Sequence, residues 1–137
     1  MKDESILASV VYDHIRDMAG IHLEYEYLPA DKGKLPCGSV QTLTGTPVSK
    51  RYKDGSYIGN YRFAVYLRCA ADDSTSRLDA ASELTSLAKQ IEESIIELPA
   101  PFTLWNIEQD TLPVKVDAEV AYEDWQATFT LTYKKGS

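Results

Sequence analysis

The segment 47–70 reads PVSKRYKDGSYIGNYRFAVYLRCA, and its two strand-forming runs meet at Asp54 and Gly55. Asp-Gly between β-forming residues predicts a hairpin, because glycine accepts the positive φ that a tight primed turn demands. After the turn, apolar side chains alternate onto one face and predict a core strand. These side chains are Tyr61, Phe63, Val65, Leu67 and Cys69. Gly59 and Asn60 interrupt the first half of this strand, so we expect the hairpin to project beyond the sheet.

Helical spacing of apolar residues predicts one helix on each side of this segment. The first covers residues 4–18, with Asp3 as its cap and Gly20 as its end. The second begins in a cap-rich cluster near Ser76 and continues to about residue 97, just before two prolines. The apolar stripes expected to face the core are Ile6, Leu7, Val10, Val11, Ile15 and Met18, then Leu78, Ala81, Leu84, Leu87, Ala88, Ile91 and Ile95.

Period-2 alternation predicts further strands between the first helix and the hairpin. Residues 21–27 alternate between apolar and polar side chains, which is typical of a strand with one buried face. Residues 28–38 contain prolines and glycines and are expected to form a loop. Residues 40–44 are then expected to form a short strand.

The C-terminal third predicts three more strands. The first two cover residues 102–110 and 114–122, with a turn at Leu112-Pro113 between them. Glu123-Asp124 is expected to close a hairpin, and residues 125–133 alternate cleanly as the last strand.

This order of elements predicts a single α+β domain over residues 1–137. We expect a largely antiparallel or mixed β-sheet, with two helices packed on one face and a protruding β-hairpin. The opposite face would carry Arg62, Tyr66 and Arg68 together with the threonines of the last strand. That face must meet water or another subunit.

Composition excludes several classes of function. The 137 residues include 14 Lys plus Arg against 21 Asp plus Glu, for a net charge of −7. Such an acidic balance argues against a general nucleic-acid binder, and no apolar run approaches the roughly 20 residues of a membrane span. The first residues lack the cationic and apolar blocks of a signal peptide, so we expect a cytoplasmic protein.

Residues capable of catalysis or metal binding are few and scattered. His14 and His22 are not in a metal-binding spacing, and His14 is expected to be a packing residue. Cys37 and Cys69 are too few for a disulfide framework or a zinc site. They are expected to be reduced thiols that are buried or half-buried, although Cys37 lies in a loop that could expose it. We therefore assign no catalytic residue, no cofactor and no metal, and expect a protein that is not an enzyme.

The hairpin carries the one local cluster of basic and aromatic residues. One interpretation is an exposed hairpin whose charges protect its edge. The other is a recognition arm, because Tyr and Arg are favoured in the cores of protein interfaces. The candidate interface residues are Arg51, Tyr52, Lys53, Asp54, Gly55, Ser56 and Tyr57. Their positive charge could meet the acidic remainder of an identical neighbour, which would favour a head-to-tail ring.

The hairpin and the elements that follow it resemble those of a known protein family. The run RYKDGSYIGNYRFAVYLR at residues 51–68, the polar break and long helix after it, and the closing FTLTYKK resemble tail-terminator proteins of long-tailed bacteriophages, often labelled minor capsid proteins. The likeness covers nearly the whole chain, is strongest in the hairpin and is weak over residues 28–45. It is a likeness of lengths and alternation, without a catalytic signature.

The resemblance implies a non-enzymatic assembly protein of the virion, located near the head-tail junction and assembled in the bacterial host cytoplasm. It implies a ring, typically a hexamer, that sits on the tail tube, stops its polymerisation and offers a surface for head joining. The implied partners are copies of the chain itself, the tail tube protein and head connector proteins. DNA would only pass through the ring, and no membrane is involved.

Two alternatives remain open. The first is a head-completion or connector adaptor, which would bind portal-containing heads instead of tail tubes. The second is a small-ligand-binding α+β domain. That alternative predicts a polar cavity between helices and sheet with at least one perturbed titratable group.

Overall fold

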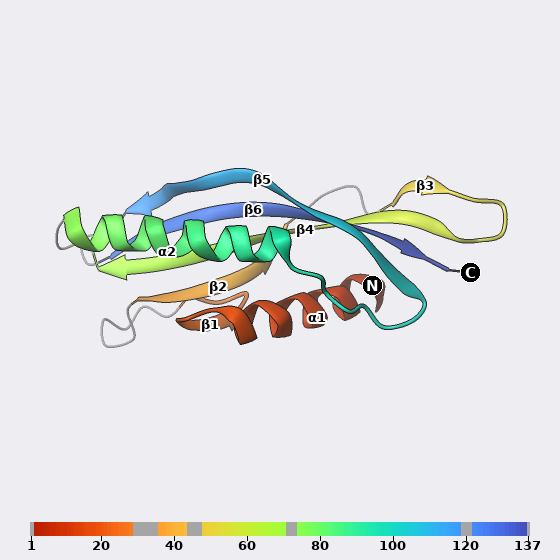
Figure 1. Ribbon diagram of the computed structural model, residues 1–137, viewed down its shortest axis with the longest axis horizontal. Helices are drawn as coiled ribbons and strands as arrows, with labels where there is room; N and C mark the ends of the chain where they lie inside the picture. Colours follow the sequence, from red (N-terminus) through yellow and green to blue (C-terminus); the bar gives the residue numbers. More distant parts are fainter. Residues whose placement is uncertain (1, 29–35, 44–47, 71–73, 119–121, 137) are drawn as a thin grey trace.

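The computed structural model describes residues 2–28, 36–43, 48–70, 74–118 and 122–136. Both helices pack on the same face of a six-stranded sheet (Figure 1). The elements are α1 (Lys2–Met18), β1 (His22–Tyr25), β2 (Cys37–Thr42), β3 (Val48–Arg51), β4 (Tyr57–Ala70), α2 (Ser74–Glu93), β5 (Phe102–Ala118) and β6 (Tyr122–Lys135). The predicted single α+β domain is confirmed.

The sheet is mixed, because β1 pairs with β2 in parallel and every other pairing is antiparallel. The strand order is β1-β2-β4-β6-β5. β3 pairs with the first residues of β4, on the same edge of β4 that pairs further along with β2. Gly38 in β2 lies where a side chain would not fit. A Cβ there would come within 2.5 Å of Leu23 Cδ2 and 2.7 Å of the Tyr66 carbonyl oxygen.

The central pair of strands, β4 and β6, is in continuous register along all 14 residues of each strand, from Tyr57 opposite Lys135 to Ala70 opposite Tyr122. Side chains alternate between the two faces, so this pairing decides which ones reach the helices. The predicted core face of β4 is confirmed. Phe63 and Phe129 are fully buried on this face, and their rings stack with centroids 5.1 Å apart.

The helices differ from the prediction at their ends. α1 begins at Lys2, so Asp3 lies inside the helix and is not its cap. α2 ends at Glu93, where Ser94 donates both its backbone N–H (3.2 Å) and its hydroxyl (2.7 Å) to the Ile91 carbonyl oxygen. The chain therefore leaves helical spacing early. The expected burial of Ile95 is therefore wrong, since it is 85% exposed and Ile96 is buried instead. The expected burial of Ile6 and Leu78 is also wrong, since they are 40% and 70% exposed.

β5 is one long strand in place of two strands joined by a turn. The predicted turn at Leu112-Pro113 is accommodated by register shifts between Gln109 and Thr111 and between Thr111 and Val114. A proline is tolerated because β5 is the last strand of the sheet in the described residues, where an N–H need not pair.

The predicted turn at Glu123-Asp124 is also wrong. Both residues lie within β6, where Glu123 pairs with Cys69 and Asp124 pairs with Arg68. Each of the two carboxylates is buried against an arginine, Glu123 against Arg77 and Asp124 against Arg68. These distant partners, which local sequence does not reveal, make a strand of a segment that resembles a turn.

The N-terminal strands are also shifted from the prediction. β1 ends at Tyr25 because Glu26 adopts a φ of 59°, and both Tyr25 and Tyr27 are exposed instead of buried. β2 begins at Cys37, so the predicted loop is shorter than expected at this end. Residues 29–35 of that loop lie outside the described residues.

Removing the Phe129 ring should test the stacked core. Phe129→Ala should lower the free energy of unfolding by about 3–5 kcal/mol, because it leaves a cavity against Phe63. Urea denaturation measures the change. The exposed Leu78→Ala is the control and should stay within about 0.5 kcal/mol of the parent. Equal effects for the two variants would contradict this description of the core.

Candidate protein interface

The β3–β4 hairpin projects past both helices at one end of the long axis (Figure 1). β3 pairs with the start of β4 through Arg51 opposite Tyr57 and Lys50 opposite Ile58. On its other side, the same part of β4 pairs with the last residues of β6. The hairpin is therefore a continuation of the central strands and not a separate loop.

The turn is a three-residue loop in place of the predicted two-residue turn. The Tyr52 N–H donates to the Ser56 carbonyl (2.9 Å), and the Gly55 N–H donates to the Tyr52 carbonyl (3.2 Å). Gly55 has a φ of 93°, which confirms its predicted positive φ and suits a turn followed by a glycine bulge. The Asp54 carboxylate accepts both the backbone N–H of Ser56 (2.9 Å) and its hydroxyl (2.6 Å).

Cations lie close to the aromatic rings of Tyr52 and Tyr57, which flank the hairpin turn. Lys50 Nζ and Lys134 Nζ lie 5.3 and 5.4 Å from the Tyr52 ring centroid. Arg51 Cζ lies 5.6 Å and Lys135 Nζ 5.9 Å from the Tyr57 ring centroid. These distances suit cation–π attraction. We call the following residues the basic hairpin cluster: Lys50, Arg51, Tyr52, Lys53, Lys134 and Lys135.

Sequence reasoning missed the two lysines of β6. The register of the β4–β6 pair would have revealed them. When these two strands pair continuously, Lys134 lies opposite Ile58 and Lys135 lies opposite Tyr57. The ending FTLTYKK carries these lysines, but its position beside the hairpin depends on a pairing between residues far apart in the chain.

The structure divides the seven candidate interface residues into two groups. Arg51, Tyr52 and Lys53 are exposed and available for contact. Asp54, Gly55 and Ser56 build the turn, and Ser56 is buried. Tyr57 is half-buried, with its ring 6.2 Å from that of Tyr133, so its packing belongs to the monomer. The exposed group is thus the better candidate for recognition.

No metal site forms within the described residues, because no group of three or more His, Cys, Asp or Glu side chains gathers there. His14 is half-buried and its Nε2 lacks a hydrogen-bond partner; burial lowers its pKa, against an opposing effect of Asp17. Both cysteines are buried free thiols, which confirms the expected burial and excludes the exposed position that the loop could have given Cys37. Burial raises the pKa of the Cys69 thiol. None of the described helices is long and apolar enough to cross a membrane.

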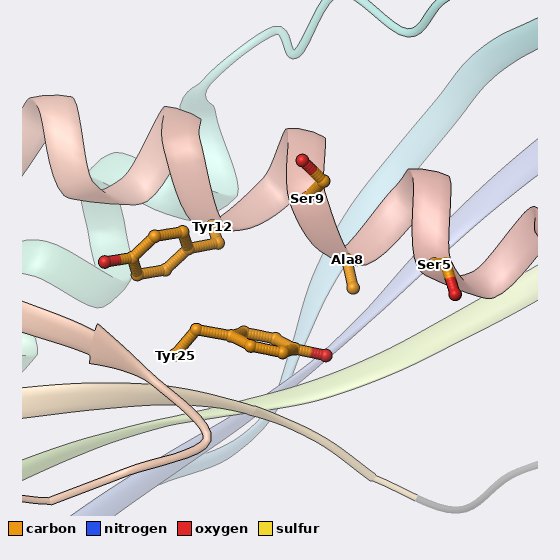
Figure 2. Close-up of a pocket in the computed structure, with 5 residues that line it drawn as sticks. All are labelled: Ser5, Ala8, Ser9, Tyr12 and Tyr25. Carbon is orange, nitrogen blue, oxygen red and sulfur yellow. The ribbon is translucent and has the colours of Figure 1, made fainter.

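A pocket of about 280 Å³ lies between α1 and β1 (Figure 2). It is lined by Ser5, Ala8, Ser9, Tyr12 and Tyr25. The Tyr12 hydroxyl donates to the Leu23 carbonyl (2.9 Å), and its ring meets that of Tyr25 edge-on at 5.8 Å. The lining offers hydroxyls and rings but no carboxylate, amine or imidazole. It therefore lacks the charged group that ligand-binding sites commonly use for orientation.

Comparison with known proteins adds no relative to this description. A scan against models of protein families and a search of curated proteins both gave no match. The fold and the hairpin therefore carry the functional argument.

The Asp54 turn should be sensitive to acid. Hydrogen bonds from the Ser56 hydroxyl and then the Ser56 N–H lower the Asp54 pKa from its ordinary value of 3.8. A carboxyl group whose pKa is lower in the folded state stabilises the fold at any pH above its unfolded-state pKa. This contribution is lost as the pH falls through the folded-state pKa. Carboxyl-detected NMR should show Asp54 titrating below 3.8, and Ser56→Ala should raise that midpoint. An unchanged midpoint in Ser56→Ala would contradict the assigned cause.

Proposed function

We propose that this protein is a non-enzymatic structural protein of a long-tailed bacteriophage. Copies of it form a ring on the end of the tail tube, stop tube polymerisation and provide the surface for head joining. The observation that carries the proposal is the projecting hairpin with its basic and aromatic side chains, on a chain of net charge −7.

The charge distribution favours contact with another protein. The hairpin and the adjoining end of β6 hold five of the 14 Lys and Arg residues, namely Lys50, Arg51, Lys53, Lys134 and Lys135. Asp54 is the one carboxylate within the turn, and Ser56 already engages it. Cationic side chains therefore outnumber carboxylates on the hairpin and the adjoining end of β6. An acidic partner surface would complement this excess of positive charge, and the chain as a whole has a net charge of −7.

The helix-free face of the sheet supports an assembly role in a different way. Its polar side chains bond to one another across strands: Gln126 Nε2 donates to the Tyr66 hydroxyl (2.7 Å), and Thr132 Oγ1 donates to Asn60 Oδ1 (3.1 Å). Thr111 and Thr128 hydroxyls lie 2.8 Å apart. Because the polar groups of this face already have hydrogen-bond partners, packing a second sheet on it would add few new hydrogen bonds. Such a face suits a terminator, which must not present a second tube-binding surface.

The proposal predicts that exposed hairpin side chains are needed for rings. The doubly substituted Tyr52→Ser, Lys53→Ser protein should keep its melting temperature within about 2 °C, since both side chains are exposed. It should cap polymerised tail tubes at least roughly tenfold less well, because buried Tyr contacts dominate many interfaces. Electron microscopy of protein mixed with tubes measures capped ends and tube length.

The matched control is Tyr27→Ser, which removes an exposed tyrosine from a different surface. It should cap tubes as the parent does. If the parent protein leaves tubes uncapped but binds portal-containing heads, the connector role replaces the terminator role. Binding to neither would refute both phage assignments.

A further inference from the structure

The outer edge of β5 carries exposed apolar side chains that the monomer does not use. β5 is the terminal strand of the described sheet, and its exposed fractions are 54% for Trp105, 74% for Leu112, 49% for Val114 and 47% for Val116. The last three lie within five consecutive residues of the C-terminal half of the strand. Contiguous exposed apolar residues on a sheet edge mark a contact surface.

This edge is built for side-chain contact and against continuous strand addition. β5 has register shifts at four places along its length, and Pro113 has no N–H to donate. Bulges and prolines of this kind prevent a long ladder with a foreign strand. The N–H of Gln109 is already occupied, because it donates to Glu92 Oε2 of α2 (3.0 Å).

Two carboxylates lie near Gln109, just before this apolar run begins. Glu92 reaches Gln109 from α2, and the exposed Glu108 lies on β5 itself. The nearby cations are already engaged: Lys115 Nζ lies 3.9 Å from Glu123 Oε2, and Arg62 Nε lies 3.9 Å from Asp110 Oδ2. We call the following residues the β5 edge surface: Glu92, Glu108, Leu112, Val114 and Val116.

We propose that the β5 edge surface of one copy receives the basic hairpin cluster of a second copy, an inference that rests on the proposed ring. The two surfaces match in kind: one is apolar with carboxylates beside it, the other aromatic with cations around it. Tyr52 and the lysine stems would cover Leu112 and Val114, while the ammonium groups meet Glu92 and Glu108. Neither surface alone buries its apolar part.

The chain cannot satisfy this contact by itself. Figure 1 shows the C-terminal end of β5 and the hairpin tip at opposite ends of the long axis. Because these two different surfaces lie far apart on one molecule, they can meet in a heterologous, head-to-tail contact, and such contacts generate rings when the rotation closes. Each subunit of the ring would give one hairpin and receive another.

Charge reversal on both sides tests the contact. Lys53→Glu and Glu108→Lys should each weaken self-association by at least about fivefold, since each places like charges together. An equimolar mixture of the two variants should restore association, because every contact in an alternating assembly then joins opposite charges. Sedimentation velocity over a range of protein concentrations measures this. Zero-length carbodiimide cross-linking of isotopically distinct copies should join a hairpin lysine to Glu92 or Glu108.

The apolar part of the surface has its own matched pair. Leu112→Ser should reduce association, whereas Leu78→Ser should not, although the two leucines are similarly exposed at 74% and 70%. Absence of the intermolecular cross-link, failure of the mixture to restore association, or equal behaviour of the two leucine variants would overturn the inference. If all of these variants still form rings that cap tubes, the terminator role is supported but the proposed contact is refuted. Rescued association with no tube or head binding would support the contact and refute the role.

Discussion

The continuous pairing of β4 with β6 organises both the core and the hairpin. Because side chains alternate along a strand, a slip of one residue would turn Phe63 and Phe129 away from the helices. The register is held at one end by Arg68, whose Nε and Nη2 donate to the two Asp124 carboxylate oxygens at 2.7 and 2.9 Å. Both partners are nearly buried, and Asp124 is the main reason that the Arg68 pKa is raised. The stacked phenylalanines hold the middle, so polar and apolar contacts specify the same register.

The same pairing explains why the hairpin is placed for recognition. β4 has 14 residues, and the end that begins at Tyr57 extends past the helices while β6 still accompanies it. The β4 strand of the hairpin is consequently paired on both sides, with β3 and with β6, and a turn with three hydrogen bonds that involve Ser56 closes the hairpin. A rigid arm loses less conformational entropy on docking than a mobile loop would. Lys134 and Lys135 join the cluster only because β6 reaches this far.

The far end of the sheet shows how tertiary partners override local patterns. Glu123 is buried on the helix side, where Arg77 Nε of α2 contacts its two oxygens at 3.0 and 3.1 Å. This ion pair ties the start of β6 to α2, just as Asp124 ties it to β4 on the opposite face. Two adjacent acidic residues look like a turn when only their neighbours are considered. Burial of both carboxylates requires arginines that are 46 and 56 residues away in the chain.

Local sequence patterns were enough to predict the α+β class, the core face of β4, the last strand and the glycine of the hairpin turn. These features depend on period-2 and helical spacing and on the conformational freedom of Gly55, which are local properties. The parallel β1–β2 pair and the single long β5 became evident only from the three-dimensional arrangement of the strands. That arrangement also decided which lysines surround Tyr52 and which apolar residues of β5 stay exposed. Those outcomes depend on which strand lies beside which, and neighbours that are distant in sequence leave no periodic trace in the local residues.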